Sequence, residues 1–558
     1  MPTVDAAAPD RPWRRPGAVR YALHRLHRLV RPTVEVYEPP TGCVVTDNNV
    51  AVPTRDGTVL RVNVCRPTGE GPFPVLLCAH PYGKDKLPAK GRIPFQYRIL
   101  RQPGHVRFSS LTTWEAPDPA WWTAKGFAVV NCDLRGAGTS EGTGALLTVQ
   151  EGQDGYDLVE WAAAQPWSTG AVGMLGVSYL AISQWNTAAQ RPPHLRAIVP
   201  WEGMTDPYRD LLRPGGIQEI GFVTMWARGL KGNRATFDIA QRNTEHPVRD
   251  GFWESLTPDL TAIDVPALIC GSLSDNNLHS RGSIRGFQHI SSCHKHLYTH
   301  RGGKWMTFYS EEARAAQLAF LNRHLRDGAE KPLPPVRVEV RASRDEIVEV
   351  RAEDDWPLPS TQWTPLYLGA EGLTAEPGPT QGSLDFHTRR GGVRFGWTVP
   401  ADTELTGPMA LRLFVSMVGA DDVDLFVGVE KWCGSKYVPF EGSYGFGRDR
   451  VTTGWLKASM RTLDTEASTP SEPVPSYQTP KPLQPGEVVQ VDIALGPSST
   501  LFRAGDQLRV VVAGRWLWPV NPLTGQLPAR YARGPRGTCT LHWGQNRQPR
   551  LLLPVIKG

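Results

Sequence analysis

The chain has 558 residues, which is too long for one hydrophobic core and predicts two or three domains. Hydrophobic residues make up 40% and charged residues 21%, as in ordinary globular proteins, and no apolar run approaches the ~20 residues that a membrane span needs. The net charge of +6 is small for this length, so it gives no reason to expect a nucleic-acid partner.

The chain begins with a basic segment, and we expect residues 1–40 to form an N-terminal arm. Residues 11–31 hold its concentrated basic run. Such a run can dock on a membrane surface or an acidic partner, although a solvated amphipathic helix or a loose arm is the interpretation we favour. The first residues, MPTVDAAAPDRPWRR, lack the apolar core of a signal peptide.

The eight cysteines contain no CxxC pair and no cluster at metal-ligand spacing, so no metal and no cofactor is expected. Cys78, Cys132 and Cys270 lie in apolar, strand-like runs, where a free cysteine behaves as a small buried hydrophobe. Reduced cysteines of this kind predict a cytoplasmic protein.

Residues 41–330 alternate strand-like and helix-like segments. Strands are predicted at 58–67, 74–80, 126–134, 171–177, 195–201, 265–271 and 296–300, and helices at 152–165, 179–190 and 310–325. This alternation predicts a mainly parallel sheet that is covered by helices on both faces.

About sixty residues, 204–264, separate two of the predicted strands, which is too long for a plain crossover. We interpret them as a helical cap over the site. Phe222, Trp226 and Leu230 would form its apolar face at i, i+4, i+8 spacing, unless these side chains simply pack on the core.

Residues 336–558 change to alternating, β-branched segments between Gly, Pro and Asp turns, such as VRVEVRA, LRLFVSMV and LRVVVAG. Helical signals disappear. The pattern predicts a β-sandwich or jelly roll, in which residues 466–487 form a Pro-rich surface loop.

The stretch GMLGVSYLAISQW, residues 173–185, places Ser178 between a predicted strand and a predicted helix, two residues after Gly176. Hydrolases mount a nucleophilic serine on such a turn, usually within G-x-S-x-G. Here Leu180 stands at the position of the second glycine. The alternative is a serine that merely caps the helix.

Hydrolases with such a serine turn carry Ser, then Asp or Glu, then His along the chain. Asp275 in the loop SLSDNN and His300 at the end of HLYTH follow Ser178 in this order. Both follow strands, at the sheet edge where catalytic loops gather. Asp264 precedes its strand. His279 falls on the expected next helix, and His294 and His296 come too early, so we interpret these residues as surface or core.

The oxyanion hole needs two donors. The backbone N–H of Tyr179 is one candidate. The loop CAHPYGKDK, residues 78–86, has no glycine run, so the hydroxyl of Tyr82 is the second candidate unless this tyrosine only packs.

Together these segments resemble the cocaine esterase and Xaa-Pro dipeptidyl-peptidase family of acyl hydrolases, the CocE/NonD type. Residues 173–185 are similar to its nucleophile segment, although Ala181 replaces the usual glycine. PYGK resembles its oxyanion tyrosine loop, GSLSDNNLHSRGS its acid loop and LYTHRGGKW its histidine loop. The resemblance implies roles for Tyr82, Asp275 and His300, and a C-terminal jelly roll.

VVNCDLRGAGTSEG, residues 129–142, is similar to the family's D-x-R-G…S-x-G segment, in which we expect Asp133, Arg135 and Ser140 to be structural. The whole chain is thus expected to be an α/β-hydrolase domain with an inserted cap, followed by a jelly-roll domain. The jelly roll is expected to wall the active site rather than to bind carbohydrate.

The expected reaction is acyl transfer from a small-molecule ester or amide to water through a covalent acyl-enzyme. Bulky acyl groups would suit a pocket of aromatic side chains. The candidate pocket residues are Trp121, Trp122, Trp201, Phe222 and Trp226.

A peptide or α-amino acyl substrate would instead need carboxylates for its free amine, and Glu202 and Asp206 are the candidates. We favour the ester. A binding protein without catalysis is the outside alternative, and homo-oligomer formation is left open.

Overall fold

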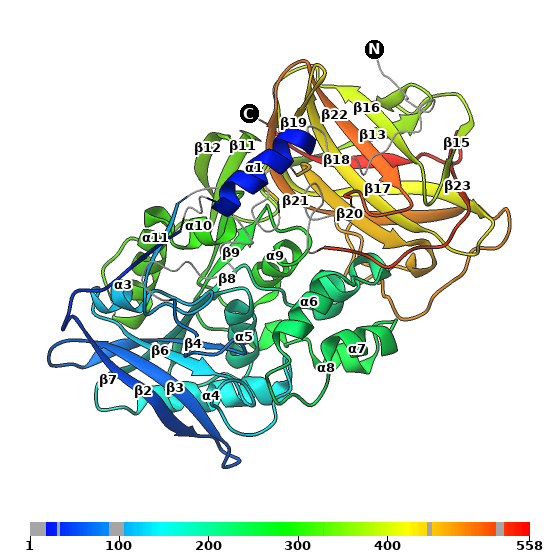
Figure 1. The fold of residues 1–558 in the computed structure, drawn as a ribbon. Helices are drawn as coiled ribbons and strands as arrows, with labels where there is room; N and C mark the ends of the chain where they lie inside the picture. Colours follow the sequence, from blue (N-terminus) through cyan, green and yellow to red (C-terminus); the bar gives the residue numbers. More distant parts are fainter. Residues whose placement is uncertain are drawn as a thin grey trace.

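In the computed structural model, residues 18–30, 34–88, 105–326, 328–442, 449–519 and 529–557 are described. Figure 1 shows a first part, blue to green, in which helices surround a sheet, and a second part, yellow to red, that consists mainly of strands. The predicted combination of an α/β part and a C-terminal β part is confirmed. The boundaries of the predicted domains stay a prediction.

The sheet of the first part has the strand order β2-β3-β6-β4-β7-β8-β9-β10. All neighbours from β6 to β10 pair in parallel, whereas β2 and β3 pair antiparallel at the edge. The parallel sheet predicted from the alternation of strands and helices is therefore present.

The strands of this part are β1 (Val34–Tyr37), β2 (Val44–Pro53), β3 (Val59–Pro67), β4 (Phe73–His80), β5 (Val106–Ser109), β6 (Ala128–Asp133), β7 (Ser168–Val177), β8 (Leu195–Trp201), β9 (Ala267–Ser272) and β10 (Lys295–His300). The helices outside the segment between β8 and β9 are α1 (Ala18–Val30), α3 (Pro119–Thr123), α4 (Val149–Ala163), α5 (Tyr179–Ala188), α9 (Ser280–His289), α10 (Lys304–Phe308) and α11 (Glu311–Leu325). Each predicted strand and helix is found within a few residues of its expected bounds.

Both faces of the sheet are buried, because successive residues of one strand enter different clusters. Met174 of β7 belongs to the cluster that includes Trp185 of α5, whereas Leu175 belongs to the one that includes Phe320 of α11. Continuous apolar runs rather than alternation are the sequence signature of such strands.

The segment between β8 and β9 contains short helices, as predicted. They are η1 (Tyr208–Leu212), η2 (Pro214–Gly216), α6 (Phe222–Gly229), α7 (Ile239–Glu245), α8 (Gly251–Ser255) and η3 (Leu260–Ala262). Trp226 of α6 is buried and contacts the ring of Tyr179, so this segment lies against the start of α5.

The C-terminal part consists of strands that pair antiparallel with one another, apart from a short parallel pairing of β11 with β21 at Arg341 and Thr500. Its central strand β17 pairs with β21 on one side and with β23 and β24 on the other, and β18 lies between β20 and β22. We call this part the β domain.

The elements of the β domain are β11 (Val336–Ser343), β12 (Glu346–Glu353), β13 (Thr361–Gly369), β14 (Gly372–Thr374), β15 (Gly382–His387), β16 (Gly392–Thr398), β17 (Thr403–Val418), β18 (Asp424–Cys433), β19 (Lys436–Val438), β20 (Thr452–Lys457), η5 (Ala458–Met460), β21 (Val489–Phe502), β22 (Asp506–Ala513), β23 (Thr538–Trp543) and β24 (Arg550–Ile556).

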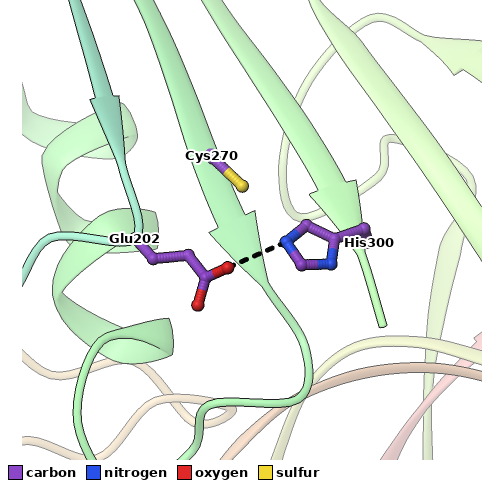
Figure 2. Close-up of side chains that lie close together, drawn as sticks. All are labelled: Glu202, Cys270 and His300. Carbon is purple, nitrogen blue, oxygen red and sulfur yellow. Dashed lines mark hydrogen bonds and ion pairs between the residues drawn. The ribbon is translucent and has the colours of Figure 1, made fainter. Parts of the chain in front are cut away.

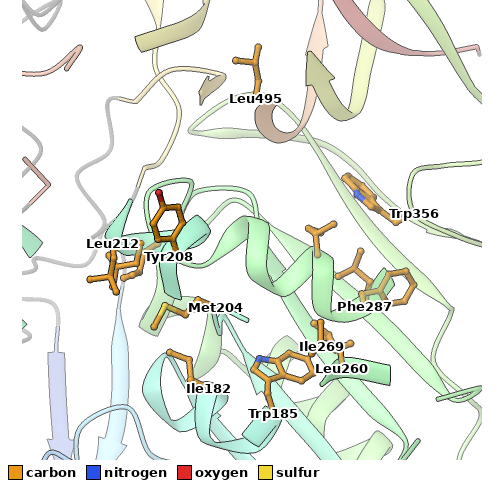
Figure 3. Close-up of a cluster of buried hydrophobic side chains, with 14 of the residues drawn as sticks. Ile182, Trp185, Met204, Tyr208, Leu212, Leu260, Ile269, Phe287, Trp356 and Leu495 are labelled. Atoms are coloured by element: carbon orange, nitrogen blue, oxygen red, sulfur yellow. The ribbon is translucent and has the colours of Figure 1, made fainter. Parts of the chain in front are cut away.

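The two parts share one hydrophobic core. Strand β10 pairs in parallel with β11 through Leu297 and Val336. Figure 3 shows buried side chains of the first part, such as Trp185 and Met204, together with Leu495 of the β domain, and all three belong to one cluster. The β domain is therefore packed directly on the first part of the chain rather than joined to it by a flexible linker.

Of the expected arm, residues 1–40, the structure describes the helix α1, in which Tyr21 is buried, and residues 34–40, in which β1 pairs with β5. Residues 1–17 and 31–33 lie outside the described residues. Within the described part of the chain, no helix has the length and apolar character required to cross a membrane.

Candidate active site

Ser178 lies on a strained turn between β7 and α5. Its φ of 60° and ψ of −115° are costly for a residue with a side chain and are typical of functional sites. Ser178 is the N-cap residue of α5, yet its side chain makes no capping hydrogen bond, which argues against the helix-cap alternative. The turn is held by its backbone, because Ser178 N–H donates to Trp201 O and Ile182 N–H donates to Ser178 O.

Small neighbours make this turn feasible. A Cβ on Gly176 would lie 2.4 Å from Cβ of Leu180, so only glycine fits there. Ala181, which replaces the family's usual glycine, lies against Gly203, where an added Cβ would come within 2.8 Å of the Ala181 methyl group. The methyl group of Ala181 therefore fits because residue 203 is a glycine.

His279 is the histidine that contacts Ser178. Its Nε2 lies 2.9 Å from Oγ of Ser178. His279 is the N-cap residue of α9, on a tight turn in which the N–H groups of Leu278, His279 and Ser280 all approach Asp275 O. Burial, with a further contribution from the positive charge of Lys304, holds the pKa of His279 well below its usual range, whereas Asp275 opposes this shift. The ring is therefore neutral at physiological pH and able to accept a proton.

The predicted contact between Ser178 and His300 is not formed. His300 ends β10, and its Nε2 lies 3.1 Å from Oε1 of Glu202. Gly302 N–H can only donate, and it approaches Nδ1 of His300 at 3.2 Å, so the ring proton lies on Nε2 and donates to Glu202. Both ring nitrogens are thus engaged within the protein. His279 is buried and begins a helix, in agreement with its interpretation as a surface or core residue near the next helix, but that interpretation did not foresee its contact with Ser178.

Asp275 lies in the loop after β9, as predicted, and is buried. It makes an ion pair with Lys304, whose Nζ lies 2.8 Å from Oδ2 of Asp275 and 3.8 Å from Oε2 of Glu202. A lysine therefore stands where the sequence predicted a histidine beside the acid. The carboxylates raise the pKa of Lys304 despite its burial, so this side chain stays charged.

Glu115 is a further buried carboxyl that the sequence did not single out. It has a φ of 64°, and its backbone carbonyl accepts from Val177 N–H, directly before Ser178. Burial raises the pKa of Glu115 to about 8, and its electrostatic neighbours include Lys304, Glu202 and Asp275. Glu115 is therefore mostly protonated at neutral pH.

The two predicted oxyanion tyrosines lie side by side. The rings of Tyr82 and Tyr179 make an edge contact with centroids 6.2 Å apart. Burial is the main cause that raises the pKa of Tyr82 well above its usual value, so its hydroxyl remains a donor. The hydroxyl of Tyr179 instead donates to Glu151 at 2.5 Å, which leaves its backbone N–H as the group available at the turn.

The segment predicted to be structural does hold the Tyr82 loop. Asp133 accepts from Lys84 N–H at 2.6 Å, and Ser140 Oγ donates to Asp133 O. Arg135 makes ion pairs with Asp154 and Asp56. These contacts confirm the structural interpretation.

Glu202, Cys270 and His300 bring one potential metal-ligand atom each within 4.8 Å of one another, as Figure 2 shows. The residues do not fit a cation, because His300 already donates to Glu202 and the ammonium group of Lys304 lies beside the other carboxylate oxygen. Burial also holds the pKa of the Cys270 thiol well above its usual value.

The predicted aromatic pocket requires correction for three residues. Trp122 and Trp201 are 1% and 0% exposed and pack in the core that includes Phe308. Trp121 contacts the ring of Trp122 and the cations Lys125 and Arg314. Clustered tryptophans thus reflect core packing here.

Phe222 and Trp226 lie on α6 and pack against the cluster that contains Tyr179. The alternative amine carboxylates are engaged elsewhere, because Glu202 binds His300 and Asp206 binds Arg249 at 3.1 Å.

Comparisons with known proteins identify relatives of this chain. Residues 56–243 match the family model of X-Pro dipeptidyl-peptidase (S15 family), and residues 327–517 match that of the X-Pro dipeptidyl-peptidase C-terminal non-catalytic domain. Cocaine esterase from Rhodococcus sp. (strain MB1 Bresler) is 26% identical over 91% of this chain and 98% of that protein.

Among solved structures, a CocE/NonD family hydrolase from Staphylococcus aureus is 35% identical, with a TM-score of 0.88 over 92% of this chain and 94% of that chain. An α-amino acid ester hydrolase shares the fold at 18% identity, with a TM-score of 0.69 over 93% of this chain and 98% of that chain. Since the Staphylococcus aureus relative covers nearly the whole chain, this protein belongs to the CocE/NonD family of hydrolases.

Proposed function

We propose that this protein is a serine hydrolase that cleaves small carboxylic esters through Ser178, with His279 as the general base. The observation that carries the proposal is the 2.9 Å contact between Ser178 Oγ and His279 Nε2 on a strained strand-to-helix turn. Ser178 is partly exposed, so a substrate carbonyl can reach its hydroxyl.

The reaction proceeds in two halves. His279 Nε2 takes the proton of Ser178 as Oγ attacks the acyl carbon, and it then gives this proton to the leaving alcohol as the ester bond breaks. Water next attacks the acyl-enzyme, with its proton again taken by His279, and the acid leaves as Ser178 regains its proton. The backbone N–H of Tyr179 and the hydroxyl of Tyr82 stabilise the negative oxygen in both halves.

Asp275 acts on His279 through its charge. It favours the imidazolium that forms during the reaction, whereas Lys304 favours the neutral ring before the reaction. Because Lys304 also binds Asp275, the two opposing charges are held in one fixed arrangement. This assignment keeps the predicted acid and replaces His300 by His279 as its histidine.

The second candidate function is an Xaa-Pro dipeptidyl-peptidase, which the match over residues 56–243 favours. The carboxylates first considered for a substrate amine, Glu202 and Asp206, are engaged by protein cations and by His300, and this supports the ester. A neutral aryl ester and an Xaa-Pro anilide, tested on the same protein, distinguish the two functions.

We further propose that residues 204–264 form a cap over the substrate and that the β domain is a jelly roll with a supporting role. All eight cysteines are free, which supports a reducing compartment such as the cytoplasm. The proposed partner is a small-molecule ester or amide, with no nucleic acid and no cofactor.

The test is Ser178→Ala, which we expect to abolish ester turnover and labelling by a fluorophosphonate probe without loss of the fold. Ser183→Ala is the matched control, because this serine lies on the same helix with its hydroxyl bound to Ala79 O. Turnover of Ser178→Ala at the wild-type rate, or an adduct on another serine, would remove Ser178 from the mechanism.

A further inference from the structure

A cavity of about 250 Å³ lies between α9 and the β domain. It is lined by Arg209, Arg281, Arg285, Trp455 and Glu472 together with apolar side chains. We call this cavity the arginine pocket. Neither Ser178 nor His279 is among its lining residues, although Arg281 and Arg285 lie on the helix that begins directly after His279.

The three arginines differ in how well the protein neutralises them. Arg285 is fully paired, because its Nη1 lies 2.9 Å from Oδ1 of Asp210. Arg209 is weakly paired, with 3.5 Å between its Nε and Oδ2 of Asp206, a carboxylate that also binds Arg249.

Arg281 has no carboxylate within ion-pair distance among the described residues. Its Nη2 donates to the carbonyl oxygens of Thr453 and Ala494, and its guanidinium group lies 4.9 Å from the ring centroid of Trp455. The carbonyl groups bind the cation without neutralising it. Arg281 therefore has no directly paired negative charge at the wall of the cavity.

Glu472 acts on Arg281 and Arg285 only through its nearby charge, without a direct ion pair. It accepts a hydrogen bond from Gln288 Nε2 at 3.3 Å and makes no ion pair within the described ranges. Burial is the leading cause that raises its pKa, and the same burial lowers the pKa of Arg209 and Arg281. All three shifts have burial as their leading cause, so the charged groups of the arginine pocket are largely removed from water.

We infer that the arginine pocket binds a small organic carboxylate, held by the guanidinium groups of Arg209 and Arg281. Planar guanidinium groups match a carboxylate in geometry and charge. Arg281 lacks a carboxylate partner and Glu472 would repel a dianion, so a single negative charge fits best. The apolar walls, which include Leu456 and Ile493, favour a ligand with an apolar body over a bare inorganic ion.

The experiment is calorimetric titration of Ser178→Ala with sodium benzoate, sodium acetate and inorganic phosphate at matched ionic strength. We expect benzoate to bind with one equivalent, more tightly than either acetate or phosphate. Arg209→Gln is expected to weaken benzoate binding roughly tenfold or more, because a charge-assisted hydrogen bond is lost. Arg196→Gln, at an exposed arginine of β8, is the control that leaves binding unchanged.

Arg281→Gln is expected to weaken binding further, but Arg281 also joins the two parts of the molecule, so Arg209→Gln keeps the test independent of folding. Equal benzoate affinity in Arg209→Gln and in the parent would overturn the proposal, since the acid would then be bound elsewhere, for example at Ser178. Phosphate binding more tightly than benzoate would overturn the ligand class. Neither result would affect the assignment of Ser178, which depends on turnover.

Discussion

His279 and His300 are both buried near the same edge of the sheet, but the two rings have different partners and therefore different roles. His279 begins a helix, contacts a partly exposed serine and is kept neutral by burial and by Lys304. His300 ends a strand and has both nitrogens occupied, one by Glu202 and one by the N–H of Gly302. A histidine whose two nitrogens are engaged holds structure, whereas one that shares a nitrogen with a nucleophile can move a proton.

The largest effects on turnover and stability are expected from substitution of His279 and of His300. His279→Ala removes the base and should lower kcat by about 10⁴-fold or more with the fold intact. His300→Asn should chiefly lower the free energy of unfolding, by about 3–5 kcal/mol, because Glu202 loses its buried partner. Esterase kinetics and denaturant unfolding of both variants measure the difference. The comparison fails if His300→Asn folds stably and loses turnover while His279→Ala retains it.

The next effect concerns the donor beside the nucleophile. Tyr82→Phe removes a hydroxyl that burial keeps protonated, so kcat should fall about 100- to 1,000-fold with little change in stability. Tyr309→Phe is a control, since its hydroxyl donates to Ala116 O. A loss of only a few-fold in Tyr82→Phe would exclude this residue from the oxyanion hole.

A smaller effect is expected at Gly203, which lies next to Glu202 and packs on the turn that carries Ser178. Gly203→Ala would place a Cβ 2.8 Å from the Ala181 methyl group, and crowding of this kind costs about 1–3 kcal/mol. Ala181→Gly in the same chain should restore part of the loss. Thermal unfolding of the single and double variants measures this coupling, and strictly additive changes would contradict the contact.

The smallest effect concerns pH. Glu115 has a pKa of about 8, so it is neutral below that pH and gains a negative charge above it. Because Glu115 interacts electrostatically with Tyr82, this charge opposes the developing oxyanion, and kcat should decline as pH rises through 8. Glu115→Gln should stay active at higher pH. A profile that declines equally in Glu115→Gln would assign the alkaline limb to another group.

The sequence predicted the parallel sheet and the turn at Ser178 because apolar runs and strand–turn–helix context are local signals. Asp275 was also predicted, since the edge of a parallel sheet fixes where a loop residue lies. Which histidine contacts Ser178 could not be predicted from local sequence signals. The turn from Asp275 to Ser280 folds back on itself through three N–H groups that share one carbonyl oxygen, and nothing in the residue types around His279 shows that its ring points to Ser178.

The tryptophans were misplaced for a related reason. Trp122 and Trp201 are aromatic, as the residues of a substrate pocket often are, but the residue type does not show whether a side chain lines a pocket or packs in the core. Both side chains lie in the buried cluster on one face of the sheet. The contact between Ala181 and Gly203 joins residues twenty-two positions apart in the chain. An alanine in place of the usual glycine therefore indicates that a small residue lies opposite it in the fold.

Arg301 extends from the residue after His300 into the β domain, where its guanidinium group donates to the carbonyl oxygens of Arg450 and Val451. The interface between the two halves of the chain therefore begins one residue after His300. Cutting the polypeptide near residue 330 would not release an autonomous catalyst. A chimera that joins the first half of the chain to another protein would need two acceptors in place of the carbonyl groups of Arg450 and Val451.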